Sequence, residues 1–322
     1  MCTAVSYCPS DHYFGRNLDL ERSYGEGVII TPRHYPFKFR NGSVLNVHYA
    51  IIGIATTAND YPLYFEAVNE HGLCLAGLNF PNNAHYFPHI AQKDNISPFE
   101  LIPWLLGTCK NMEEAESKLA SINLWNEPFS NQYPLSPLHW LLCDRTKALT
   151  IESIEEGLRI YNNPIGVLTN NPPFPYHMHN LANYMALTNK PPKNNQPIPL
   201  TPYSLGMGSF GLPGDMSSGS RFIKAAFTKL HSVCEPEENS AVNQFFHILG
   251  SVYQQRGLTQ LENGKYEYTL YTSCCNTDKG IYYYRTYDSS QIISVNMNYE
   301  DLDSNKLIAY PLLKGCSIQS QN

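Results

Sequence analysis

The sequence predicts an α+β protein, in which strands and helices follow one another in groups. Short apolar or alternating runs rich in β-branched and aromatic residues fill the first half of the chain, and helical patterns come after them in blocks. Such grouping favours layers of sheet and helix over an alternating parallel sheet. The 23 tyrosines among 322 residues also favour sheet. With 43% apolar and only 16% charged residues, the chain is neither disordered nor a coiled coil.

The first half is predicted to contain mainly strands, separated by turn residues such as Glu70-His71-Gly72. The predicted strands are Thr3–Tyr7, Tyr13–Asp19, Val28–Thr31, Val47–Ala55, Leu63–Val68 and Leu73–Phe80. Two helices follow, at the strongly apolar Pro98–Cys109 and at Glu113–Ile122. For the second helix, Asn111 is the predicted N-cap and Glu114 its reciprocal acid.

The second half returns to strands and ends in a predicted antiparallel meander. Its elements are strands at Leu138–Cys143, Leu149–Ser153, Leu158–Tyr161 and Gly166–Thr169, helices at Ser220–Ser232 and Ala241–Tyr253, and strands at Tyr268–Cys275, Ile281–Tyr287 and Ile292–Met297. We find no internal repeat and no linker that divides the chain, so residues 1–322 are expected to form a single domain.

Residues 189–214 are rich in Pro, Asn and Gly and are predicted to form a long loop excursion. Within it, Gly206 to Gly211 matches the dinucleotide-binding spacing G-x-G-x-x-G. That motif needs a preceding strand and a following helix. A proline-rich loop precedes it here and Leu212-Pro213-Gly214 follows, so we interpret the match as a loop and predict no nucleotide site.

Bulk properties exclude several classes of protein. The net charge of −6 comes without a basic stripe, which argues against nucleic acid as a partner. No apolar run is long enough to span a membrane, and the charged residues among the first twenty exclude the apolar core of a signal peptide. The nine cysteines include no C-x-x-C pair, and His177 and His179 are interpreted as surface or loop residues without further metal ligands. We therefore expect a cytoplasmic protein and predict no zinc site from the histidine spacing.

Cys2, directly behind the initiator methionine, is the main candidate for chemistry. Cysteine is small enough to allow removal of Met1, which would leave one residue carrying both a thiol and a free α-amine. In isolation an α-amine titrates near about 8 and a thiol near about 8.5, both close to neutral pH. The amine can therefore accept the thiol proton and return it to a leaving group, as in N-terminal threonine nucleophiles.

Arg16 and Asp19 are predicted to lie beside Cys2. If the first two strands form a hairpin, both residues fall near the end where Cys2 begins. A neighbouring cation such as Arg16 favours the thiolate. A carboxylate such as Asp19 can hold the α-amine in position, as a carboxylate holds a catalytic histidine.

Several stretches, in one order and spacing, carry a family resemblance. They are MCTAVSY, FGRNLD, YPLYFEAVNEHGL, AGLNFP, LHWLL, NPIGVLTNNP, GLPGDMSSGSRF and GIYYYRTYD. Together they closely resemble the choloylglycine hydrolase family, including its bile-salt-cleaving members from gut lactic acid bacteria, over residues 2 to about 310. The resemblance implies an N-terminal-nucleophile hydrolase with a four-layer αββα sandwich of two antiparallel sheets. It further implies hydrolysis of the amide between a bile acid and glycine or taurine without metal or cofactor, and a homotetramer that uses the 189–214 loop for assembly.

The resemblance also assigns roles to individual residues. Cys2 is the nucleophile, Arg16 the arginine near its sulfur, and Asp19 the carboxylate directed at the amine. Asn79 and an asparagine of LTNNP stabilise the oxyanion, with Asn170 the better match and Asn171 left open. A second arginine of the site corresponds to Arg221.

The resemblance also places four residues around the steroid, each of which could equally belong to the core: Leu18, Tyr24, Phe65 and Leu138. A rigid apolar steroid requires such a mostly hydrophobic pocket. The alternatives are a penicillin V acylase, an acylase of other N-acyl amides, and a non-catalytic steroid binder on the same fold. In the resemblance, asparagine at the position of Asn79 goes with bile salt hydrolases and tyrosine with penicillin acylases, which favours bile salts.

Overall fold

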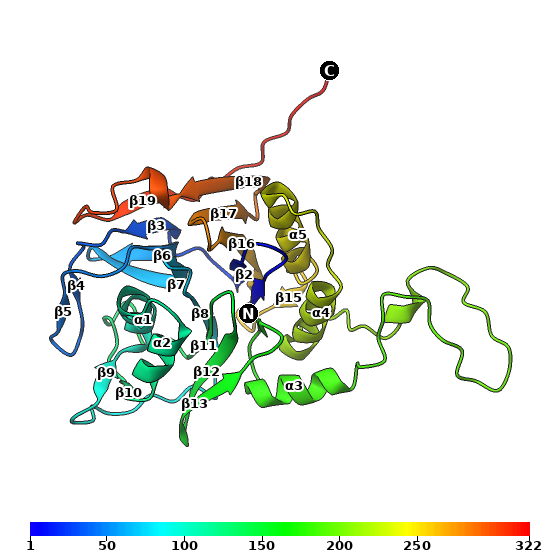
Figure 1. Cartoon of the computed structure of the whole chain (residues 1–322), viewed down its shortest axis with the longest axis horizontal. Helices are drawn as coiled ribbons and strands as arrows, with labels where there is room; N and C mark the ends of the chain where they lie inside the picture. Colours follow the sequence, from blue (N-terminus) through cyan, green and yellow to red (C-terminus); the bar gives the residue numbers. More distant parts are fainter.

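The computed structural model describes residues 1–322 and contains two large sheets in which every pairing is antiparallel (Figure 1). Sheet A has the order β14 (Val167–Leu168), β1 (Cys2–Tyr7), β2 (Tyr13–Leu20), β16 (Tyr266–Asn276), β17 (Ile281–Thr286), β18 (Ser289–Asn296), with β15 (Thr259–Gln260) beside β16. Sheet B has the order β13 (Gly157–Asn162), β12 (Ala148–Ile154), β11 (Leu138–Cys143), β8 (Cys74–Asn79), β7 (Tyr61–Asn69), β6 (Ile51–Ala58), β3 (Gly27–Thr31), β19 (Ile308–Pro311).

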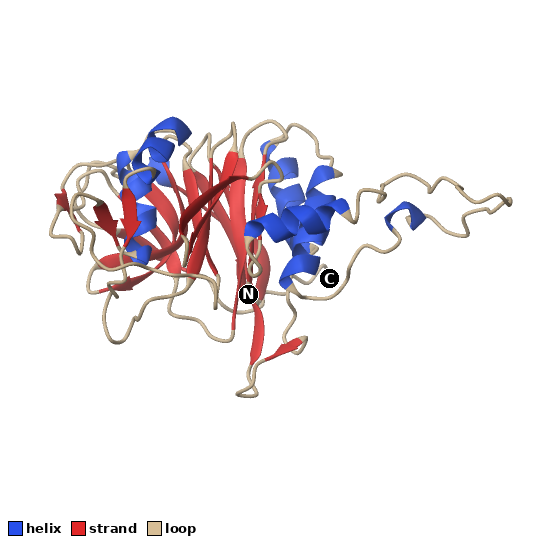
Figure 2. Cartoon of the chain, turned by 90° about the horizontal axis from the view of Figure 1, so that it is seen from below, coloured by secondary structure: helices blue, strands red, loops and turns tan.

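The two sheets pack face to face, and each carries helices on its outer face (Figure 2). Sheet B contacts α1 (Leu101–Thr108), which is followed by α2 (Met112–Leu119). On the other side, sheet A contacts α4 (Ser218–Leu230) and α5 (Glu238–Gly250), and α3 (Phe174–Ala182) packs on α4. Strands β1 and β2 of sheet A touch β8 of sheet B between the layers. The predicted α+β sandwich of two antiparallel sheets is confirmed, with the layers in the order αββα.

This layering explains why the central strands have nearly continuous apolar sequences. A strand covered on both faces must bury successive side chains on opposite sides, so strict alternation is lost. Strand β3 is buried at every position, and β8 at all but its last residue. At the sheet edges, by contrast, the residues of β13 and β19 are exposed or half-buried, and none is fully buried.

The predicted elements occur in the structure with shifted boundaries, while helix α3 and several short strands were not predicted. The segment predicted as Glu113–Ile122 stops as helix α2 at Leu119, and β10 (Ile122–Leu124) then pairs in parallel with β9 (Asp94–Ile96). Asn111 is the N-cap of α2, but the Glu114 carboxylate accepts a hydrogen bond from the backbone N–H of Lys110 instead of Asn111. Residues 47–50 precede β6 as a loop, and the short hairpin of β4 (Phe37–Lys38) and β5 (Val44–Leu45) was not predicted.

Helix α3 was missed because three residues unfavourable to a helix, Asn171, Pro172 and Pro173, stand directly before it. Pro173 is in fact the N-cap, and Pro175 lies in the first turn, where proline is tolerated because the N–H it lacks has no partner within the helix. The interpretation of His177 as a surface or loop residue was wrong, since it lies on this helix with no exposed side-chain area.

The excursion at 189–214 extends away from the sandwich, as Figures 1 and 2 show. Its only regular structure is a 3₁₀ turn at Met207–Ser209, and a hydrogen bond from Thr188 N–H to the carbonyl of Gly208 closes its base. No helix begins directly after Gly211, in agreement with the prediction of a loop. None of the helices combines the length and the apolar character needed to cross a lipid bilayer.

Gly15, in the middle of β2, is required by close packing against β16. A Cβ atom built there would lie 2.1 Å from the carbonyl oxygen of Ser273. We expect Gly15→Ala to lower the free energy of unfolding by about 2–3 kcal/mol, since overpacking a rigid sheet forces the backbone to move. Thermal denaturation of both proteins measures this. Gly214→Ala is the control, since nothing lies within 4 Å of its Cβ, and we expect it to change stability by less than about 0.5 kcal/mol.

Candidate active site

Cys2 is the first residue of β1, an inner strand of sheet A that pairs with β2 on one side and β14 on the other. Its side chain is buried, with 2% exposed. The predicted hairpin of the first two strands is confirmed, and it pairs Cys2 with Leu18 and Ala4 with Arg16. Because paired residues and their i+2 neighbours share a face, Cys2, Leu18 and Arg16 all face sheet B.

Arg16 crosses the space between the sheets and is almost fully buried. Its Nη1 donates hydrogen bonds to the carbonyl oxygens of Gly77 (2.6 Å) and Phe65 (3.1 Å), both in sheet B. Burial by itself would lower the pKa of Arg16, but the nearby Cys2 thiol, Tyr271 and Glu66 raise it above its ordinary value. The structure therefore places a permanent cation beside the Cys2 sulfur.

The backbone of Cys2 is held by Asn170 and Arg221. The N–H of Cys2 donates to Oδ1 of Asn170 at 2.8 Å, and Arg221 donates from Nη1 to the carbonyl of Cys2 and from Nη2 to the same Asn170 oxygen. Arg221 comes from the first turns of α4 and also binds the Thr3 hydroxyl at 2.7 Å. Burial lowers the pKa of Arg221, although Asp19 and Cys2 act in the opposite direction.

Asn170, and not Asn171, is the asparagine of LTNNP that contacts Cys2. Asn170 Nδ2 donates to the carbonyl of Asn79 at 2.7 Å, which brings Asn79 into the same cluster from the end of β8. The Asn170 carbonyl contacts Nε2 of His177 at 2.9 Å. Asn171 instead points its amide at the carbonyl of Pro81.

Asp19 lies near the chain end but does not contact Cys2 through its carboxylate. It sits on the opposite face of β2 from Arg16, where its carboxylate accepts hydrogen bonds from Thr269 (2.6 Å) and Gln254 (3.3 Å). Burial raises its pKa, while the charges of Arg221 and of the chain terminus act to lower it. The predicted arrangement, with the Asp19 carboxylate on the amine of Cys2, is not what a chain that retains Met1 displays.

In this chain, which retains Met1, the terminal ammonium occupies its own set of contacts. It forms an ion pair with Glu267 at 2.5 Å and donates to the carbonyl of Asp19 at 2.8 Å. Glu267 belongs to β16 and is separated from Met1 by 266 positions. Sequence reasoning missed it, since no motif marks the residue and only the pairing of distant strands brings it to the chain end.

Three of the four predicted steroid contacts lie close to this cluster. Leu18 pairs with Cys2, Leu138 pairs with Asn79, and the carbonyl of Phe65 binds Arg16. Tyr24 lies in the turn after β2 and is 39% exposed, with the guanidinium of Arg22 5.0 Å from its ring. Leu18, Phe65 and Leu138 are also packed within the two apolar cores, so packing explains them as well.

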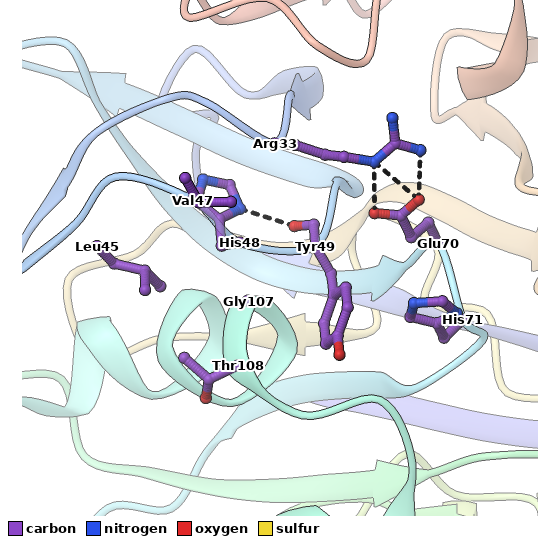
Figure 3. Close-up of a pocket in the computed structure, with 9 residues that line it drawn as sticks. All are labelled: Arg33, Leu45, Val47, His48, Tyr49, Glu70, His71, Gly107 and Thr108. Atoms are coloured by element: carbon purple, nitrogen blue, oxygen red, sulfur yellow. Dashed lines mark hydrogen bonds and ion pairs between the residues drawn. The ribbon is translucent and has the colours of Figure 1, made fainter.

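A separate open pocket of about 540 Å³ lies at the other end of sheet B (Figure 3). It is lined by Arg33, Leu45, Val47, His48, Tyr49, Glu70, His71, Gly107 and Thr108. Glu70 and His71 precede β8, whereas Asn79 ends it, so the length of that strand, roughly 17 Å, separates the pocket from the Cys2 cluster. Arg33 and Glu70 form a bidentate ion pair, as Figure 3 shows, and Arg33 also binds Asp303.

The Cys2 cluster thus combines a thiol, a fixed cation and amide donors at one strand end. A thiolate is a strong nucleophile, and side-chain amides can stabilise the negative oxygen of a tetrahedral intermediate. No group of three or more His, Cys, Asp and Glu side chains is arranged to hold a metal ion. The geometry suits acyl transfer through a covalent intermediate.

Comparison with known proteins agrees with this chemistry. The family model for linear amide C–N hydrolases, choloylglycine hydrolase family, matches residues 2–310. A bile salt hydrolase/transferase of Lactiplantibacillus plantarum is 57% identical, with 97% of both chains aligned, and one of Clostridium perfringens is 38% identical over the full length of both.

Solved structures give the same result for the fold. The crystal structure of a conjugated bile acid hydrolase from Clostridium perfringens superimposes with a TM-score of 0.92 at 37% identity, covering all of both chains. Penicillin V acylase from Agrobacterium tumefaciens has a TM-score of 0.77 over 98% of this chain and 95% of its own, at 16% identity, and shares the fold.

Proposed function

The chain belongs to the choloylglycine hydrolase family of linear amide C–N hydrolases, and on that premise we propose that it hydrolyses the amide bond between a bile acid and glycine or taurine with Cys2 as the nucleophile. The observation that carries the proposal is the placement of the Cys2 thiol beside the buried Arg16 cation, with Asn170 and Arg221 on the Cys2 backbone. The names of the relatives at 57% and 38% identity support the substrate class.

The reaction begins once Met1 has been removed. The freed α-amine of Cys2 takes the thiol proton, and the thiolate, stabilised by Arg16, attacks the amide carbon. The tetrahedral intermediate collapses to a thioester as the protonated amine returns its proton to the leaving glycine or taurine nitrogen. Water then attacks the thioester, releases the bile acid and regenerates the thiol.

Asn79 and Asn170 are the proposed oxyanion donors. A side-chain amide has two N–H donors, and one from Asn170 already binds the carbonyl of Asn79. The other remains for the oxyanion. Arg221 fixes the Cys2 carbonyl and the Asn170 oxygen together, and so positions the nucleophile. For Asp19 we propose an electrostatic role, which its mutual influence with the terminal ammonium supports.

A comparison of three substrates tests the proposal. Glycocholate, taurocholate and penicillin V are offered separately, and release of the amino acid or side-chain acid is followed by chromatography. We expect both bile salts to be hydrolysed, with penicillin V slower or unchanged. Hydrolysis of penicillin V or of other N-acyl amides alone would make the chain an acylase of another substrate class. Binding of bile salts without turnover would make it a steroid binder.

Acyl transfer is a second activity, favoured by the words hydrolase/transferase in the names of relatives at 57%, 38% and 37% identity. A free amine can attack the same thioester in place of water, which yields a new amide and the free thiol. Incubation of glycocholate with an excess of a second amino acid, followed by mass spectrometry of the bile acid products, tests for it. Only free bile acid among the products would exclude transfer.

The two neighbouring asparagines provide a matched pair of variants. We expect Asn170→Ala to lower kcat by about 10²–10³, because it removes an oxyanion donor. Asn171→Ala should cost less than about tenfold, since the Asn171 amide binds Pro81 and not the cluster. Steady-state kinetics on glycocholate measures both. Equal losses in the two variants would contradict the assignment of the oxyanion contact to Asn170.

We also propose that the chain, as a single domain, forms a homotetramer in the cytoplasm. The excursion exposes Leu205 at 97%, together with Tyr203 and Phe210, and such apolar exposure supports a protein contact. The absence of any disulfide among the nine cysteines supports a reducing compartment. Light scattering of the full chain against a variant with 189–214 shortened tests the assembly; equal masses would exclude the excursion from it.

A further inference from the structure

Glu66 is a buried carboxyl that the proposed mechanism does not use. It belongs to β7 of sheet B, is fully buried, and faces sheet A. There it accepts hydrogen bonds from Tyr282 (2.5 Å), Tyr271 (2.8 Å) and Ser273 (3.0 Å), which come from β17 and β16. One carboxyl of sheet B thus gathers three hydroxyls of sheet A.

Glu66 is linked to Arg16 in two ways. Its Oε2 lies 3.8 Å from Nη1 of Arg16, and both side chains are 1% exposed. In addition, the backbone N–H of Arg16 donates to the Ser273 hydroxyl at 3.1 Å, and that hydroxyl donates to Glu66. Since the Cys2 thiol acts on the same guanidinium, Arg16 stands between two acidic groups, the thiol and the carboxyl.

Arg16 is the only charged neighbour of Glu66, whereas the Cys2 thiol also interacts with Arg221. In its own sheet, Glu66 pairs with Ile54 of β6 and Ala76 of β8, which do not titrate. From sheet A the titratable neighbours are Arg16 on β2, Tyr271 on β16 and Tyr282 on β17, with Cys275 near Tyr282. Arg16 is therefore the single cation available to both Glu66 and Cys2.

We propose that Glu66 is a positioning residue that sets how strongly Arg16 acts on the Cys2 thiol: when Glu66 is neutral the guanidinium charge favours the thiolate, and when Glu66 is ionised it compensates that charge. The inference rests on the proposed function in one respect, that Cys2 is the nucleophile. It adds a carboxyl outside the assigned set to the residues that govern the reaction.

The ionisation of Glu66 falls in a useful range. Burial raises its pKa to about 7, although Arg16 and the hydrogen bonds of Tyr282, Tyr271 and Ser273 act to lower it. Below pH 7 the carboxyl is mostly neutral and Arg16 acts on the thiol undiminished. Above pH 7 the carboxylate forms and, through Arg16, opposes formation of the thiolate.

The test measures thiolate formation directly, without substrate. Met1-free protein is treated with iodoacetamide between pH 4.5 and 9, and the alkylation rate at Cys2 is followed by mass spectrometry. Fragmentation separates Cys2 from the exposed Cys8, which shares its tryptic peptide. We expect Glu66→Gln to move the alkylation midpoint to lower pH by about 0.5–1 unit, since a neighbouring negative charge is removed.

Tyr282→Phe provides a second route that keeps the carboxyl. Without this hydrogen bond the neutral form of Glu66 persists to higher pH, so the midpoint should move in the same direction by a smaller amount. Tyr284→Phe on the same strand is the control, because that hydroxyl accepts from Leu313 N–H and does not touch Glu66. Its midpoint should match that of the wild type.

The outcomes separate this inference from the proposed function. A merely structural Glu66 would lower the melting temperature and leave the alkylation midpoint unchanged, which would overturn the inference. If Glu66→Gln fails to fold, an unchanged alkylation midpoint in Tyr282→Phe would overturn the inference instead. Shifted midpoints in a protein that hydrolyses no bile salt would sink the proposed function and uphold the inference.

Discussion

Cys2→Ser is expected to lose bile salt hydrolysis by on the order of 10³ or more in kcat, the scale on which enzymes lose activity with their nucleophile. The two side chains are nearly isosteric, so a buried position at 2% exposure should retain its packing. The chemistry differs, because a serine hydroxyl gives up its proton far less readily than a thiol to an amine that titrates near about 8. Release of glycine from glycocholate measures the loss.

Cys8→Ser is the matched control for this variant. Cys8 lies just beyond β1, is exposed, and contacts none of the proposed site residues. It should retain full activity, and both variants should melt at the temperature of the parent. A Cys2→Ser protein that is folded and within tenfold of the parent would refute the assignment of the nucleophile.

Retention of Met1 is expected to lower kcat by about as much as Cys2→Ser does, because the α-amine that serves as the proposed base is then an amide. In the chain with Met1, the nitrogen of Cys2 is an amide N–H that donates to Asn170. The terminal ammonium then belongs to Met1 and is bound by Glu267. An amide nitrogen cannot accept the thiol proton. Expression in the presence of a methionine aminopeptidase inhibitor yields mixtures of the two forms, and intact mass gives the fraction of each.

Activity should rise in proportion to the fraction of chains that lack Met1. The thermal stability of the two forms should be similar, which separates loss of the base from loss of the fold. Full turnover by a preparation that retains Met1 would show that the α-amine of Cys2 is not needed, and the mechanism would have to use another base.

Local sequence patterns predicted most of the central elements, because strands covered on both faces read as continuous apolar runs. The hairpin of β1 and β2 could also be predicted, and its register places Arg16 on the face of Cys2. Helix α3 could not, since the prolines before it argue against a helix until the buried His177 and Phe174 are seen to anchor it.

In the candidate site, the contacts around the assigned residues could not be predicted from the sequence. Its assigned residues lie in motifs, but the partners that surround them are separated by long stretches of chain. Glu66 meets Tyr271 and Tyr282 across 205 and 216 positions, and Met1 meets Glu267 across 266. A single sequence holds no signal for such pairs. They arise only when two sheets of different chain segments are stacked.

The contacts of Met1 with Glu267 and Asp19 also affect when Met1 can be removed during synthesis. In the folded chain, Met1 is tied by its ammonium to Glu267 and by its carbonyl to the backbone of Asp19, so an aminopeptidase would find the end occupied. Glu267 leaves the ribosome long after Met1, however, about 10–50 s later at ordinary translation rates. We therefore expect removal of Met1, which the proposed mechanism requires, to be faster before Glu267 reaches the chain end than after folding.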